Sequence, residues 1–149
     1  MGTLIDLQSN PVSFGDGYDS LVVREYYTST DGGVSLDTTG FTKPYIRSGH
    51  IIIRKTAAEA DGTYLFKPMP LNAGGTAYAA LPADHQYYGF LIQSLPTSKP
   101  FAGVTQHAKI NPLVGTNATA QAAGVYDMTS LLTALKAALP HVIFQGDKE

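Results

Sequence analysis

The stretch that decides the fold spans residues 31–54 and reads DGGVSLDTTGFTKPYIRSGHIIIR. A glycine turn at Gly32 and Gly33 opens it, and an apolar run introduced by Ser48 and Gly49 closes it. Glycine supplies the backbone freedom that tight turns need, whereas β-branched residues favour strands. The stretch therefore predicts turns and an edge that lead into a small β core, with no set of residues that can make or break a bond.

Short strand-like segments recur through the rest of the chain. Turn-forming pairs such as Asp61-Gly62 and Asn111-Pro112 separate them, and prolines keep them short. Strands at intervals of about 8–12 residues are typical of an antiparallel sandwich or small barrel. We therefore predict a mainly β fold, a compact antiparallel β-barrel or sandwich, whose strands cover residues 50–55, 63–67, 76–81, 87–93, 101–110 and 141–144.

One helix is predicted near the C-terminus. Leu131, Leu135 and Leu139 recur at steps of four and fall on one helical face. Asp127 is a suitable N-terminal cap, and Pro140 prevents the helix from continuing. We expect the leucine face to pack on the β core or to close one end of the barrel. The preceding residues, 117–125, are rich in small side chains and are predicted to form a loop.

The first thirty residues are predicted to form an extended N-terminal arm, and residues 31–149 a single β domain that folds without it. Within residues 1–30, the segment 21–27 reads LVVREYY, which has the composition of a strand between polar flanks. An isolated strand leaves unpaired backbone groups, so it pairs with its own sheet or with the edge of another chain. We expect the second case, with Leu21 and Val23 on one face of the strand.

Composition limits the classes of function. A chain of 149 residues is one domain's worth and is long enough to bury a core. The absence of cysteine excludes disulfides and thiolate chemistry. Ten basic and twelve acidic residues give a net charge of −2, so no basic surface for nucleic acid is indicated. The apolar runs are shorter than the ~20 residues that span a bilayer, and no signal peptide is recognisable, so we expect synthesis in the cytoplasm and no membrane partner.

No catalytic, metal or cofactor site is predicted. No histidine pairs with another at the spacing of a metal motif, and no nucleophile elbow occurs. Asp84 and His85 are neighbours in a polar turn and are expected to face solvent, while residues 15–20 lack the alternating ligands of a calcium loop. An enzyme is therefore disfavoured. The four histidines given local structural roles are His50, His85, His107 and His141.

Tyrosine is the one residue type that suggests a function. The chain has nine tyrosines and no tryptophan, and tyrosine favours interfaces because its ring packs while its hydroxyl keeps a polar partner. Strand alternation places one ring of each adjacent pair in the core and leaves the other for contacts. Exposed rings also stack on sugars, which leaves a carbohydrate-binding or adhesion module as the alternative. The predicted contact residues are Leu21, Val23, Tyr26, Tyr27, Tyr45 and Tyr88.

Several sequence segments occur along the chain in an order that is similar to that of a known protein family. After residues 31–54 come YLFKPMPL at 64–71, YAALPADHQYYGFLIQSL at 78–95, KPFAGVTQHAKINP at 99–112 and LKAALPHVIF at 135–144. In this order the chain resembles the head decoration and head-fibre proteins of tailed bacteriophages. The resemblance covers roughly residues 31–144, nearly the whole body of the chain.

The resemblance implies a structural role. A protein of this kind sits on the outer capsid surface of the virion, binds the major capsid protein and stabilises the shell, commonly as a homotrimer. The chain has no collagen-like repeat or heptad run that would form a shaft, so a decoration protein is preferred over a full fibre. Whether another head-fibre protein docks on it stays open at this point.

Overall fold

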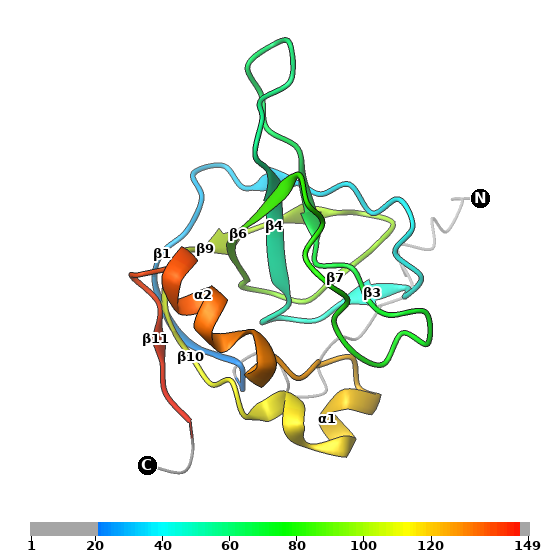
Figure 1. Cartoon of the computed structure of the whole chain (residues 1–149), viewed down its shortest axis with the longest axis vertical. Helices are drawn as coiled ribbons and strands as arrows, with labels where there is room; N and C mark the ends of the chain where they lie inside the picture. Colours follow the sequence, from blue (N-terminus) through cyan, green and yellow to red (C-terminus); the bar gives the residue numbers. More distant parts are fainter. Residues whose placement is uncertain (1–20, 147–149) are drawn as a thin grey trace, which may run out of the picture.

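The structure is a computed structural model in which residues 21–146 are described. Strand accounts for 32% of the chain and helix for 14%, which confirms the mainly β prediction. The antiparallel sheets build a half-barrel (Figure 1). The strands are β1 (Val23–Thr28), β2 (Val34–Ser35), β3 (Tyr45–Ile46), β4 (Ile51–Lys55), β5 (Phe66–Pro68), β6 (His85–Leu91), β7 (Leu95–Pro96), β8 (Phe101–Ala102), β9 (Val104–Thr105), β10 (His107–Ile110) and β11 (Ile143–Phe144).

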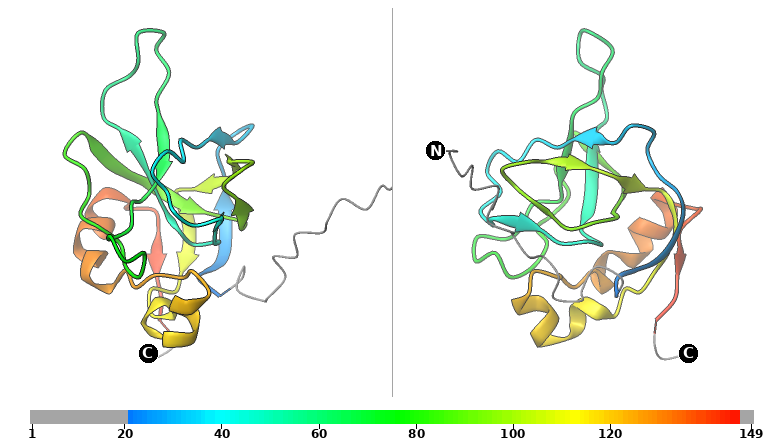
Figure 2. Two further views of the ribbon diagram at one scale, coloured as in Figure 1. Left: turned by 90° about the vertical axis from the view of Figure 1, so that its right-hand side faces the viewer. Right: turned by 180° about the vertical axis from the view of Figure 1, so that it is seen from behind.

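Two sheets organise the molecule. The central sheet has the order β5-β4-β6-β9 and is antiparallel throughout. The second, called here the three-stranded sheet, has the order β1-β10-β11, in which β1 is antiparallel to β10 and β11 is parallel to it. Two short pairs, β2-β8 and β3-β7, complete the half-barrel. The loop between β4 and β5 projects from the body, as both figures of the whole chain show (Figures 1 and 2).

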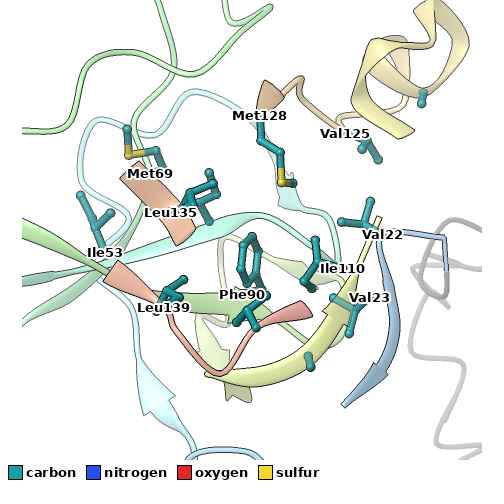
Figure 3. Close-up of a cluster of buried hydrophobic side chains, with 14 residues drawn as sticks. Val22, Val23, Ile53, Met69, Phe90, Ile110, Val125, Met128, Leu135 and Leu139 are labelled. Atoms are coloured by element: carbon teal, nitrogen blue, oxygen red, sulfur yellow. The ribbon is translucent and has the colours of Figure 1, made fainter. Parts of the chain in front are cut away.

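Strand β4 lies between two hydrophobic cores. Its residues Ile51, Ile52 and Ile53 are all fully buried, as expected for a strand that is covered on both faces. Ile51 and Ile53 belong to the larger core and Ile52 to the smaller core inside the half-barrel. In the larger core the ring of Phe90 lies among aliphatic side chains from both sheets and from the C-terminal helix (Figure 3).

The helical prediction is confirmed in its packing and corrected in its details. The helices are η1 (Val114–Thr116), α1 (Ala118–Ala122), η2 (Thr129–Leu131) and α2 (Leu132–Ala138). Leu135 and Leu139 are buried in the larger core, and Leu131 packs against it. Asp127 does not cap α2: its carboxylate accepts hydrogen bonds from the backbone N–H and hydroxyl of Thr129, and so begins the 3-10 turn that runs into α2.

The segment 117–125 is not a loop, contrary to the prediction. Asn117 caps α1, because its side-chain oxygen accepts from the backbone N–H groups of Thr119 and Ala120. A side-chain acceptor at this position satisfies donors that have no partner within the helix. The small side chains that suggested a loop are therefore compatible with one short helix.

The predicted strand 63–67 begins three residues too early, since β5 covers Phe66–Pro68, and two other predicted strands differ more strongly. Residues 76–81 form no strand apart from an isolated bridge between Leu71 and Tyr78. Instead, the side-chain oxygen of Asn72 accepts from the backbone N–H of Thr76, and this local hydrogen bond competes with pairing in a sheet. The long run 101–110 is divided among β8, β9 and β10.

The boundary of the predicted arm is wrong for residues 21–30. Strand β1 pairs with β10 of the same chain, and Val22 and Val23 are buried in the larger core. A register shift between Val23 and Glu25 breaks the simple alternation of the segment, so Val23 and Glu25 do not share a face. The backbone at Gly49 has a φ of +87°, and an added Cβ there would collide with Val22. Residues 1–20 of the arm lie outside the described residues.

Candidate interaction surface

A row of aromatic rings crosses the three-stranded sheet on its solvent side. The ring of Tyr27 on β1 lies 4.7 Å from that of His107 on β10, and His107 lies 6.0 Å from His141, just before β11. All three side chains are exposed. We call them the exposed cluster. Sequence alone missed it, because 34 positions separate the two histidines and only the parallel pairing of β10 with β11 brings them together.

A second row of side chains runs beside the exposed cluster. The Lys109 ammonium lies 3.2 Å from the Glu25 carboxylate, and Lys109 pairs in register with Ile143. The hydroxyl of Tyr27 donates to Glu25 over 3.4 Å, which links the two rows. The hydrogen bond to Glu25 raises the pKa of Lys109 above its usual value. This side of the sheet therefore combines aromatic, aliphatic and paired charged groups.

The predicted contact residues are divided by the structure. Leu21, Tyr26 and Tyr27 lie on or next to β1 and are exposed, at 44%, 51% and 44%. Val23 is a core residue, which corrects its assignment to a contact surface, because it pairs in register with the fully buried Ile110. The remaining two are each packed against an arginine: Tyr45 lies under Arg47 and Tyr88 near Arg54.

His50 is the centre of a second aromatic group, in which His50 and Tyr126 are buried and Phe41 and Tyr78 are half-buried. Its ring contacts those of Phe41, Tyr78 and Tyr126 at centroid distances of 5.5, 5.1 and 5.9 Å. Its Nε2 donates to the carbonyl of Met69 over 2.9 Å. Burial lowers the pKa of His50 from 6.5 to about 4, although the Met69 carbonyl opposes the change. We call these four rings the buried cluster, and their packing is that of a structural core.

Asp84 and His85 form a pair, contrary to the expectation that both face solvent. The Asp84 carboxylate lies 2.6 Å from His85 Nδ1, and the His85 side chain is only 11% exposed against 65% for Asp84. This hydrogen bond lowers the pKa of Asp84. The main-chain carbonyl of Asp84 also accepts from the backbone N–H and the hydroxyl of Thr56. The main chain at Asp84 therefore connects the start of the projecting loop to the start of β6.

A small cavity of about 170 Å³ lies beside this pair. Two lysines and two aspartates line it, but no hydroxyl or thiol does. Its lining residues are Asp37, Lys55, Leu65, Phe66, Lys67, Asp84 and His85.

Residues 21–146 contain no cluster of three or more histidine, cysteine or acidic side chains placed to hold a metal ion. Within the same residues, no helix has the length and apolar character to cross a membrane.

Comparisons with protein-family models, with curated proteins and with solved structures found no match to this chain. Its function is therefore inferred from its own sequence and geometry.

Proposed function

We propose that this chain is a structural virion protein that decorates the outer surface of a phage capsid, binds the major capsid protein and stabilises the shell. The observation that carries the proposal is the exposure of large apolar side chains on one small sheet. On the outer face of this sheet, Tyr27 of β1 and Ile143 of β11 are 44% and 48% exposed. Leu21 and Tyr26 are exposed as well, but Tyr26 pairs with the buried Ala108 and lies on the opposite face of β1. Exposed apolar side chains gathered on a regular element mark interaction sites.

The composition of this surface supports a protein partner. Tyrosine is enriched in protein interfaces, and the exposed rings stand beside the Lys109–Glu25 ion pair, which suits a polar rim. Burial of apolar area contributes about 25 cal/mol per Å². Copies repeated over a shell reinforce one another through multivalency, so modest contacts are sufficient to clamp adjacent capsid subunits.

A homotrimer is part of the proposal, supported by the resemblance to decoration proteins. Light scattering at micromolar concentration tests it directly. A species of about three chains supports the trimer. A mass near the 15.8 kDa of one chain, both alone and on the capsid, contradicts it.

The tyrosine rings support the carbohydrate-binding alternative less well than they support a protein partner. Tyr27 is in contact with His107, while Tyr45 and Tyr64 each have an arginine over one face. A sugar platform needs open ring faces, and here one face or edge of each ring is already engaged.

The test of the proposed function mixes the purified protein with phage heads that lack it and measures cosedimentation. We expect saturable binding and heads that withstand higher temperature before they release DNA. The Tyr27→Ala variant should bind more weakly, and Lys136→Ala, which alters an exposed residue of α2, serves as the control. Failure to bind heads, together with retention on a glycan array, would overturn the proposal in favour of the carbohydrate-binding alternative.

A further inference from the structure

The base of the projecting loop carries an unusual arginine. Arg54 lies near the end of β4, and its Cζ is 4.2 Å from the ring centroid of Tyr64 and 5.4 Å from that of Tyr88. The Tyr88 ring is held in turn by Phe66, at a centroid distance of 4.8 Å. The half-buried guanidinium is therefore positioned by two tyrosine rings that come from different parts of the chain.

One side of the guanidinium already has an acceptor. With the Gln86 amide oriented so that its oxygen faces Arg54, that oxygen accepts from Nη2 at 2.5 Å and from Nε at 3.3 Å. The N–H groups of Nη1 and the second N–H of Nη2 remain available as donors to another acceptor. These two nitrogens form the edge through which arginine binds a carboxylate in bidentate fashion.

Arg54 has no carboxylate partner among residues 21–146. Two acidic groups in neighbouring segments are engaged elsewhere: Glu59 pairs with Lys55, and Asp84 with His85. An arginine in this setting is a fixed positive charge whose donors point to a defined edge. Because its orientation is set in advance, less side-chain entropy is lost when a partner binds.

The surroundings of Arg54 resemble the centre of a protein interface. Tyr64 and Leu65 beside it are 40% and 44% exposed. Arginine and tyrosine are enriched at positions that dominate binding energy, where adjacent apolar groups exclude water. The ring faces of Tyr64 and Tyr88 are turned to the guanidinium, which favours a carboxylate side chain over a stacked sugar as the ligand.

We propose that Arg54, held by Tyr64, Tyr88 and Gln86, binds an aspartate or glutamate side chain on the surface of a protein partner. The proposal rests on the proposed function, in which that partner is the major capsid protein. It assigns the base of the projecting loop as a second contact, separate from the three-stranded sheet.

The experiment compares Arg54→Lys, Arg54→Ala and the control Lys99→Ala in binding to heads that lack the protein. Lysine keeps the charge but loses the planar fork, so we expect both Arg54 variants to bind at least tenfold more weakly and Lys99→Ala to bind like the wild type. Chemical denaturation checks that each variant is folded. If the wild type binds heads and Arg54→Lys binds them equally well, this inference is overturned while the proposed function is still supported.

A second measurement does not depend on heads. The Arg54 Nε–Hε NMR signal is followed while a synthetic glutamate-rich peptide is added, with a glutamine-rich peptide as control. A saturable shift with the acidic peptide alone supports the carboxylate site even if the protein does not bind heads, in which case only the proposed function fails. The inference is overturned if the Arg54 signal does not shift at millimolar concentrations of the acidic peptide. It is also overturned if the protein is retained on uronate glycans in an Arg54-dependent manner while the peptide causes no shift.

Discussion

His50 and His107 both contact tyrosine rings, but the two clusters around them differ in exposure. In the buried cluster, His50 is enclosed by three rings, and its Nε2 is committed to the Met69 carbonyl. In the exposed cluster, His107 lies between Tyr27 and His141 on the solvent side of a sheet. The comparison teaches that residue type does not separate a structural aromatic group from a contact surface. Burial does, because it determines whether a change alters folding or binding.

Removal of β1 would disturb both clusters most strongly. A chain that begins at Asp31 loses Tyr27 from the exposed cluster and also Val22 and Val23 from the larger core. We expect it not to unfold cooperatively in urea, whereas a chain that begins at Leu21 should do so. A cooperative transition with an unchanged midpoint in the Asp31 chain would show that β1 is not part of the core.

The next largest effect is expected at Leu135. This residue of α2 is fully buried in the core against which Tyr78 of the buried cluster packs. Leu135→Ala should lower the free energy of unfolding by about 2–5 kcal/mol, the usual range for a core truncation. The matched control, Lys136→Ala on the exposed side of the same helix, should stay within about 0.5 kcal/mol. Equal effects for the two would mean that α2 is peripheral.

Lowering the pH should destabilise the folded protein through His50 of the buried cluster. Its pKa is 6.5 when unfolded and about 4 when folded, so the unfolded state takes up a proton first and stability falls as the pH drops through this window. The contribution of His50 to the free energy of unfolding is complete above about pH 6.5. Between pH 7 and 4.5 it falls by about 2–3 kcal/mol.

Chemical denaturation at several pH values checks this expectation. His50→Gln should flatten the profile between pH 7 and 4.5, while His107→Gln should leave the loss in place because His50 is still present. The lowered pKa values of Asp37, Asp61 and Asp84 act only below their ordinary value of 3.8, outside this window. A wild-type profile as flat as that of His50→Gln would contradict the assignment.

The smallest predicted difference compares one hydroxyl in each cluster. The buried Tyr78 hydroxyl accepts from the backbone N–H of Ile51 at 3.3 Å, so Tyr78→Phe should cost about 1 kcal/mol of unfolding free energy. Tyr27→Phe removes an exposed hydrogen bond to Glu25 and should change stability by less than about 0.5 kcal/mol. Equal costs in urea denaturation would remove the energetic distinction between the clusters.

Much of the fold was predictable because it depends on local pattern. The apolar run at β4, the aromatic strand β6 and the leucine face of α2 all follow from periodicity and from the turn residues between them. The candidate surface was predicted only in part. Tyr26 and Tyr27 are both exposed, although alternation predicted that one ring of the pair would be buried. Val23 is buried instead, because it pairs in register with the core residue Ile110.

The sequence by itself determined the mainly β class, the short strands and the helix near the C-terminus, since these follow from interactions between near neighbours. Only the tertiary structure decided that β1 joins the domain, that His107 meets His141, and that Arg54 lies between Tyr64 and Tyr88. Each of these depends on strand register and on contacts between distant segments. A slip of one residue turns a strand's side chains to the opposite face, so local pattern cannot specify which rings are buried and which remain available for binding.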